Sequence, residues 1–178
     1  ANEERRSFRS SRRLLRRRKH RLERAKALLE LNGFPCTAIN KYNPYQARYN
    51  AIHSLTDKNE LAAALYHIIK RRGTTLDTPQ EDEKTSGSEL STKEQLKRNA
   101  KLLEHKYICE IQLDKLNNGE VIRDHKNRFK TEDYMKEATA ILEKQKEFYP
   151  EITDEFIKDY LNLVNSRRMY FDGPGSEK

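Results

Sequence analysis

The chain is short of cysteine and of long apolar runs. Its two cysteines, Cys36 and Cys109, form neither a disulfide framework nor a metal-spaced cluster, so we expect a reducing cytoplasm. No apolar stretch is long enough to span a membrane, and there is no signal peptide and no internal repeat. Only 35% of the residues are hydrophobic against 36% charged. That balance disfavours a large compact core and favours an extended helical assembly that is stabilised by contact with a partner.

The residue patterns of common catalytic centres are also missing. There is no glycine-rich phosphate loop and no nucleophile elbow, and the histidines are scattered without a metal-spaced cysteine or acid. Those histidines are His20, His53, His67, His105 and His125. His53 and His67 lie beside apolar helix positions, which is typical of packed or partly exposed residues. We therefore predict no catalytic residue, metal ligand or cofactor in this chain, and expect it to bind.

Charge of one sign is concentrated near the start of the chain. Residues 5–26 hold ten arginines and two lysines against one acid, Glu23, and carry about +11, whereas the whole chain is +8. With Glu3 and Glu4 also set aside, residues 27–178 are near −1. The basicity is one stripe, and a stripe of this kind needs an anion to lie against it.

The stripe has the period of an amphipathic helix about 35 Å long. Apolar residues share one side, which we expect to dock on protein: Phe8, Leu14, Leu15, Leu22, Ala25 and Leu29. Arginines cover the opposite half: Arg6, Arg9, Arg13, Arg16, Arg17, Arg21 and Arg24. Arg18 alone sits among the apolar positions, where its stem can pack while its head reaches outward.

The predominance of arginine over lysine in this helix favours nucleic acid as the anion that it binds. Guanidinium binds phosphate oxygens in pairs and stacks on bases, and a polyanion relieves the repulsion between neighbouring cations on the helix. The alternatives for this segment are a localisation signal, a membrane-surface helix or a solvated charged face. A membrane surface is disfavoured because Phe8 is the only aromatic residue on the narrow apolar side.

The rest of the chain predicts an all-α fold with an elongated helical lobe. We expect the arginine-rich helix at 1–32, a connector at 33–43, and a helical segment at 44–178 with a mobile acidic loop at about 74–90. Helices are predicted at 44–54 behind Asn43, from Thr56 to about 72, and from Ser91 to about Leu116. Two more follow, one capped by Thr131 with Phe148 inward and one opened by Thr153. Residues 119–130 form a short hairpin or irregular loop.

Several motifs resemble, in order and spacing, the type II CRISPR RNA-guided DNA endonucleases of the compact kind. The segment from Arg5-Arg6-Ser7 to Arg21 resembles their arginine-rich bridge helix, and the matches continue through the first part of their recognition lobe. They include Asn43-Pro44-Tyr45, Lys70-Arg71-Arg72-Gly73, Glu89-Leu90-Ser91-Thr92, Asn127-Arg128-Phe129, Gln145-Lys146 and Gly173-Pro174-Gly175. With no initiator methionine and a Gly-Pro-Gly turn near its end, the chain is expected to be part of a larger bacterial protein.

The resemblance implies a role for each matching residue. Phosphates of the guide RNA seed would be held by Asn2, Arg6, Arg9, Arg13, Arg17, Arg18, Arg21, Arg72 and Gly73. The guide–target channel would be lined by Arg123, Asn127 and Arg167. The repeat:anti-repeat duplex would face Tyr170, Gly173 and Gly175. Two of these assignments have a plainer alternative, because Arg72 and Gly73 also suit a helix C-cap and Arg167 suits the dipole of the last helix.

The function implied is guide-RNA and RNA–DNA heteroduplex binding within an antiviral endonuclease. The nuclease centres and the Mg²⁺ they need would lie outside these residues, so the chain alone should not cut DNA. Its implied partners are guide RNA, the target DNA strand and the remainder of the nuclease. Two alternatives stay open: a standalone RNA-binding protein of ribosomal type, and docking of an acidic inhibitor protein on the cationic helix.

Overall fold

The computed structural model describes residues 1–73, 92–122 and 128–166, and these residues form helices without a strand. In chain order the elements are α1 (Asn2–Leu31), the 3₁₀ turn η1 (Ile39–Lys41), α2 (Pro44–His53), α3 (Lys58–Arg71), α4 (Thr92–Leu103), α5 (Ile108–Asn117), α6 (Thr131–Lys146) and α7 (Asp154–Asn165). The all-α prediction is confirmed.

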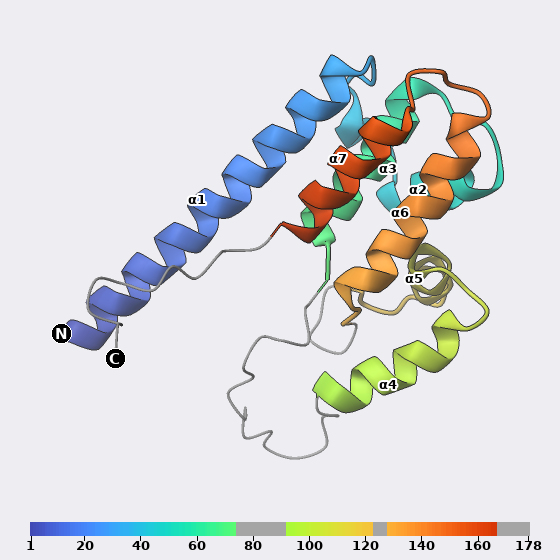
Figure 1. Ribbon diagram of the computed structural model, residues 1–178. Coiled ribbons are helices and arrows are strands. Elements are labelled where there is room, and N and C mark those ends of the chain that lie inside the picture. Colours follow the sequence, from blue (N-terminus) through green and yellow to red (C-terminus); the bar gives the residue numbers. More distant parts are fainter. Residues whose placement is uncertain (74–91, 123–127, 167–178) are drawn as a thin grey trace, which may run out of the picture.

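Helix α1 is attached to the rest of the molecule at one end (Figure 1). Its C-terminal part packs on α3 and α7, where Ala25 and Leu29 are fully buried. Residues 1–20 are all exposed, and this half extends past the packed helices. At 30 residues, α1 is about 45 Å long, which exceeds the length that the arginine run predicts.

The core is assembled from the end of α1, from α3, α6 and α7, and from the connector after α1. Phe34 is fully buried beside Phe156, at 5.8 Å between ring centroids, and beside Tyr149 at 5.9 Å. The largest contribution comes from the apolar face of α3, which buries Leu61, Leu65, Ile68 and Ile69 completely. Tyr160 of α7 donates its hydroxyl to the Leu65 carbonyl at 2.7 Å, so a polar group deep in the core is satisfied. This core holds the base of α1 firmly.

The predicted helix starts are partly correct. Asn43 accepts hydrogen bonds from the backbone N–H groups of Tyr45 and Gln46, and Thr153 accepts one from Phe156, as expected for N-caps. The cap of α3 is Asp57 rather than Thr56. The side chain of Gln46 donates to the Asn50 side chain at 2.9 Å.

Two further starts differ from the prediction. Helix α6 begins at Thr131 itself, after Lys130, whereas Thr131 had been expected to cap it. A single helix from Ser91 to about Leu116 is wrong: α4 ends at Leu103, and α5 begins at Ile108. Tyr107 precedes α5, where its backbone N–H donates to Glu110 at 3.0 Å, and its side chain is 36% exposed. Phe148, expected to point inward, is exposed just beyond the end of α6.

One buried polar cluster lies where α2, α3, α5 and α6 meet. The Arg48 guanidinium and the Glu137 carboxylate are both 0% exposed and are joined by two hydrogen bonds of 2.9 and 2.7 Å. Arg48 also donates to Gln112 at 3.0 Å and lies 3.3 Å from Nδ1 of His67. Burial is the largest single effect and lowers the pKa of Arg48, but the charge and hydrogen bonds of Glu137, with smaller contributions from Tyr134 and Cys109, together raise that pKa by more, so the guanidinium stays charged. The cluster ties the second half of the chain to the first.

Candidate nucleic-acid interface

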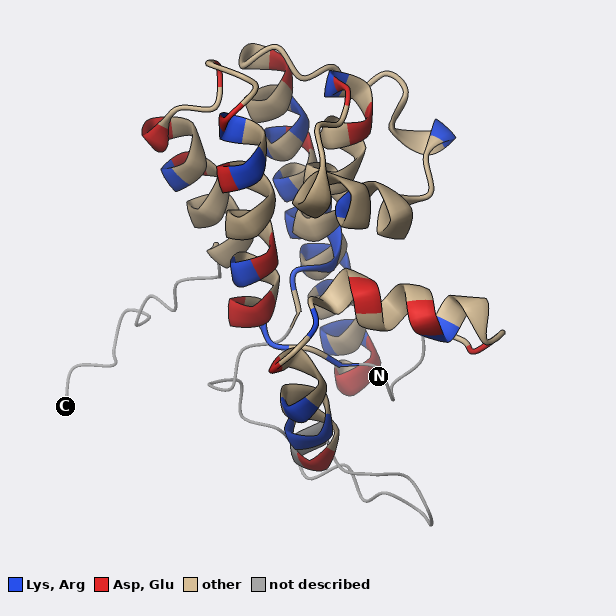
Figure 2. Cartoon of the chain, turned by 90° about the vertical axis from the view of Figure 1, so that its right-hand side faces the viewer, with Lys and Arg blue, Asp and Glu red and all other residues tan. Residues whose placement is uncertain are grey.

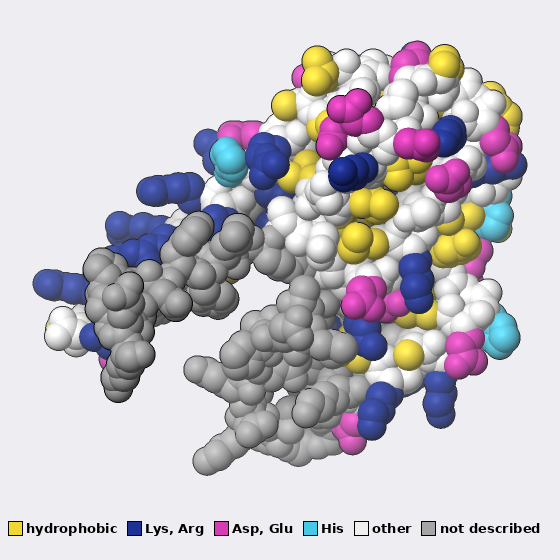
Figure 3. Space-filling view, viewed as in Figure 1, with side chains coloured by type: hydrophobic (Ala, Val, Ile, Leu, Met, Phe, Trp, Pro, Cys, Tyr) yellow, Lys and Arg dark blue, Asp and Glu magenta, His cyan; other side chains and the backbone are white. Residues whose placement is uncertain are grey.

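The candidate interface is the exposed half of α1. Lysine and arginine recur along this helix, whereas α3 to α7 each carry acidic residues as well as basic ones (Figure 2). In the space-filling view their side chains stand out along the arm that α1 forms (Figure 3). Glu3 and Glu4 in the first turn complement the helix dipole, so even the few acids here stabilise the helix. The cationic surface therefore belongs to a regular helix and has a fixed spacing.

Some arginines are folded back along the helix. Nε of Arg9 donates to the Arg5 carbonyl at 3.4 Å, and Nε of Arg17 donates to the Arg13 carbonyl at 3.2 Å. Because only Nε is used in each bond, the two terminal nitrogens stay available for a ligand. In the described residues, the only ion pair on the exposed half of α1 is Lys19 with Glu23, at 3.9 Å. An exposed pair of this length contributes little.

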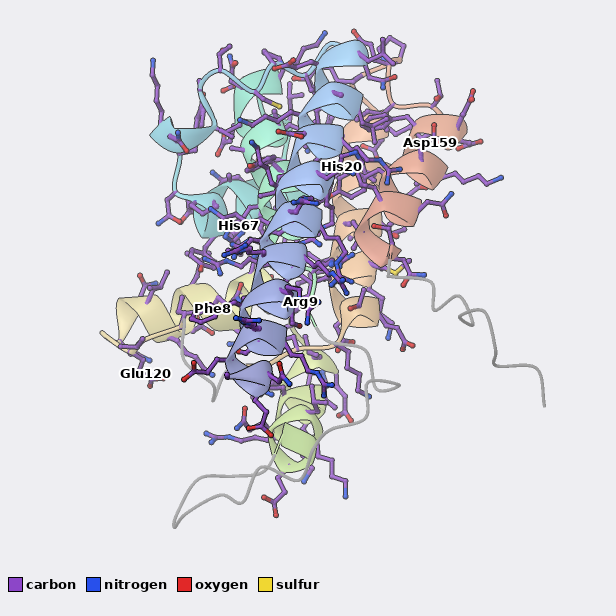
Figure 4. The ribbon with its side chains drawn as sticks, turned by 90° about the vertical axis from the view of Figure 1, so that its left-hand side faces the viewer. Phe8, Arg9, His20, His67, Glu120 and Asp159 are labelled. Atoms are coloured by element: carbon purple, nitrogen blue, oxygen red, sulfur yellow. The ribbon has the colours of Figure 1, made fainter. Side chains whose placement is uncertain are left out.

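Helical geometry groups most of the predicted seed residues. With 100° per residue, Asn2, Arg6, Arg9, Arg13 and Arg17 of α1 fall within an arc of about 80°, spread over roughly 22 Å of the helix. Arg18 follows Arg17 by 100° and so faces another side. Arg21 is half-buried where α1 meets the body. Figure 4 shows the same divergence lower on the helix, with Phe8 and Arg9 on different flanks.

The apolar side of α1 differs from the prediction. Ala25 and Leu29 are buried and Leu22 packs partly against the core, but Phe8 and Leu14 are 64% exposed and Leu15 is 63% exposed. Within this chain, docking of the apolar side is therefore confirmed for its second half, and the first half is left uncovered. The reason is geometric, because α1 extends past the helices that could cover it.

Arg72 and Gly73 end α3 and connect it to two later segments. The Arg72 guanidinium donates to the carbonyl of Ser166 at the end of α7. Gly73 has φ +72°, and a Cβ at this position would lie 2.6–2.9 Å from backbone atoms of Phe129, Lys130 and Thr131. Both residues thus have a structural role in joining helix ends. An RNA contact from either remains a prediction.

A groove on the side of α1 opposite the arginine arc was not foreseen from the sequence. It has a volume of about 460 Å³ and is lined by Leu15, Arg18, Lys19, Leu22, Glu23 and Lys26 of α1 and by Tyr66 of α3. The Lys26 ammonium lies over the Tyr66 ring, 5.6 Å from its centroid. The seven-residue spacing of Leu15 and Leu22 places them on one side of α1, but nothing in the sequence indicates that Tyr66 joins them.

Comparisons with known proteins give one consistent result. The chain is 44% identical to the CRISPR-associated endonuclease Cas9 of Staphylococcus aureus over 77% of its length, and 38% identical to Cas9 1 of Streptococcus thermophilus over 98%. A cryo-EM structure of a St1Cas9-sgRNA-tDNA59-ntPAM complex matches 99% of the chain with a TM-score of 0.79 and 36% identity. A St1Cas9-sgRNA-tDNA20-AcrIIA6 assembly matches with a TM-score of 0.80 and 37% identity.

The chain is homologous to part of Cas9, the type II CRISPR endonuclease. It spans 13% and 17% of the two curated relatives and 22% of the St1Cas9 chain in each of the two assemblies. No family model matches it. The predicted resemblance is confirmed.

Several predicted Cas9-like contacts fall outside the described residues. These are Arg123, Asn127, Arg167, Tyr170, Gly173 and Gly175, together with Ser91 and the acidic loop at 74–90. The division into 1–32, 33–43 and 44–178 also stays a prediction, although α1 ends at Leu31.

Across residues 1–73, 92–122 and 128–166, no three His, Cys, Asp or Glu side chains are grouped so as to hold a metal ion. Burial raises the pKa of the Cys36 thiol to about 11 and also raises the pKa of Cys109, so both thiols are protonated at neutral pH. Among the described helices, none is long and apolar enough to cross a membrane.

Proposed function

We propose that this chain binds the guide RNA, and then the guide–target heteroduplex, of a Cas9 endonuclease, with α1 holding the seed phosphates. The observation that carries the proposal is that Arg6, Arg9, Arg13 and Arg17 are exposed on one side of α1. None of them takes part in an ion pair within the described part of the chain. Homology to Cas9 favours a CRISPR guide over ribosomal RNA as the ligand.

The binding mode follows from the chemistry of guanidinium. Each exposed arginine offers two terminal nitrogens to a phosphate, and a straight helix presents them along one line. Backbone phosphates carry no sequence information, so this surface would fix the path of the guide while base pairing reads the target. Six phosphates neutralised on a single strand give a log–log salt slope near −4, at about 0.7 per contact.

The remaining assignments belong to the same proposal. Arg123, Asn127 and Arg167 would line the guide–target channel, and Tyr170, Gly173 and Gly175 would face the repeat:anti-repeat duplex. Cleavage, with its Mg²⁺, would come from the remainder of a Cas9, and this chain would bind without cutting. St1Cas9 structures that contain sgRNA and target DNA support these partners.

A charge-reversal series tests the proposal. Arg9→Glu, Arg13→Glu and Arg17→Glu together should abolish binding of a single-stranded guide RNA and flatten the salt slope by at least 2 units. A matched control carries the same charge change on exposed residues of α4, as Lys97→Glu, Arg98→Glu and Lys101→Glu. Kd is measured by fluorescence anisotropy between about 50 and 300 mM salt, a range over which a slope near −4 changes the affinity by roughly three decades. An equal loss of RNA affinity in both variants would mean that RNA is held by non-specific charge attraction and not by the arginines of α1.

An acidic inhibitor protein is the second candidate ligand. The uncovered cationic half of α1 favours it, because charge complementarity speeds association and selects partners. A St1Cas9 assembly with AcrIIA6 supports the idea that this kind of nuclease is bound by anti-CRISPR proteins. Native mass spectrometry of the chain with an acidic inhibitor at low salt tests it. A spectrum without a complex, or a complex that survives the α1 triple reversal, would remove this candidate.

A further inference from the structure

The groove between α1 and Tyr66 combines an apolar floor with a cationic rim. Leu15, Leu22 and the Tyr66 ring supply the apolar surface, and Arg18, Lys19 and Lys26 stand at the edge against one acid, Glu23. Glu23 lies 3.9 Å from Lys19, so the rim keeps an excess of positive charge. The groove lies where α1 leaves the body, between the fully exposed half of the helix and its buried base.

We propose that this groove holds one nucleobase of the RNA strand bound to α1, with the base on Tyr66 and its flanking phosphates on Arg18 and Lys26. This inference rests on the proposed function and adds a stacking subsite to the phosphate contacts. A nucleotide needs both halves of the groove, because its base is flat and apolar on its faces while its phosphates are anionic. A volume of about 460 Å³ lies within the range of small-ligand pockets.

The surroundings of the Tyr66 ring favour a nucleobase as the occupant of the groove. The Tyr66 side chain is partly buried against the core, and the Lys26 ammonium lies over its ring at 5.6 Å, so one surface of the ring already accepts a partner from α1. An incoming base would take the place of the ammonium over the ring, and Lys26 would move to a neighbouring phosphate. Arg18 stands at the groove rim, 100° around α1 from Arg17, so a strand held by the arginine arc would turn around the helix past Arg18 to reach the groove.

An apolar protein segment fits this groove less well. Such a segment would leave Arg18, Lys19 and Lys26 around it with a single acid to balance them, and desolvating them without partners is costly. An RNA strand brings the anions that the rim needs. Charge complementarity therefore selects nucleic acid as the occupant.

The test separates base stacking from phosphate attraction. Two probes are used with the full chain: a mixed-sequence single-stranded RNA, and inorganic polyphosphate, which has the charge but no bases. Tyr66→Ala should weaken RNA binding about 5- to 150-fold, the range found for loss of one stacked base. Polyphosphate affinity should change less than about twofold, and Tyr66→Phe should keep RNA affinity because the ring remains.

Two controls keep the outcome decisive. Leu15→Ala removes part of the floor from an exposed position on α1, so it should weaken RNA binding selectively without a change in the thermal unfolding midpoint. Tyr49→Ala removes a partly exposed tyrosine on α2 and should leave both probes unaffected. A single-stranded DNA of the same sequence should show the same dependence on Tyr66, because stacking does not need the 2′-hydroxyl.

The possible failures are distinguishable. If a folded Tyr66→Ala variant and the Leu15→Ala variant both bind RNA as tightly as the unmodified chain, the groove does not bind a base. A protein segment would then be the better candidate for its occupant. If both variants lose RNA and polyphosphate equally, the effect is on the helix and the inference is also overturned. If the unmodified chain fails to bind RNA, or the α1 triple reversal has no effect, the proposed function itself fails.

Discussion

At the residue scale, Gly73 is required by a close approach of two backbones. Its φ of +72° costs an L residue about 1–2 kcal/mol, and a Cβ would in addition lie 2.6 Å from the Phe129 carbonyl oxygen. We predict that Gly73→Ala lowers the free energy of unfolding by about 2–4 kcal/mol. Gly119→Ala is the matched control, since φ is +74° there with nothing within 4 Å of the new Cβ, and only the conformational cost should remain. Urea unfolding of both variants measures the difference, and equal losses would mean that the clash is relieved by movement.

The buried ion pair gives a second prediction at this scale. Glu137→Leu leaves the Arg48 charge unpaired and 0% exposed, so unfolding free energy should fall by about 3–5 kcal/mol. The double variant Arg48→Met with Glu137→Leu should recover part of that loss, because no buried charge is left. Denaturant melts of the single and double variants form the comparison. A double variant less stable than the single one would show that the bonds from Arg48 to Gln112 and His67 matter more than the charge.

At the element scale, helices with a regular spacing of apolar residues and a recognisable cap residue were predictable from the sequence. The helices that differ from the prediction do so for physical reasons. Asn43 and Thr153 cap as expected because a side-chain oxygen one residue before the helix has a local backbone partner. The break after Leu103 has no glycine or proline to mark it, so the helix pattern runs on through Glu104. No local pattern marks Arg48 as a buried residue, because its carboxylate partner, Glu137, is 89 positions away in the sequence. Only the tertiary fold brings them together.

The exposed half of α1 should gain order when it is neutralised. Arg9, Arg13 and Arg17 follow one another at four-residue spacing, and each such like-charge pair costs the helix about 0.2–0.5 kcal/mol. RNA removes the repulsion, so amide hydrogen exchange of residues 5–20 should slow several-fold on binding. Peptides from α6 should exchange equally with and without RNA. Unchanged exchange in 5–20 would indicate that the helix is already as stable as the body.

At the scale of the whole molecule, binding and stability reside in different parts. Side chains of residues 1–20 are all exposed, whereas the core lies beyond them, from Ala25 onward. Removing residues 1–16 should therefore shift the thermal unfolding midpoint by no more than about 2 °C, since none of the removed side chains is buried and a total change of about 0.5 kcal/mol moves the midpoint by roughly 1–2 °C in a chain of this size. The same truncation takes away Arg6, Arg9 and Arg13 and should abolish guide RNA binding. Leu29→Ala is the converse control, because it deletes a fully buried side chain at a cost of about 2–5 kcal/mol and leaves the arginine face intact. A truncated chain that unfolds many degrees lower would mean that residues 1–16 make stabilising contacts with the rest of the protein. The assignment of RNA binding to the exposed half of α1 and of stability to the core would then be wrong.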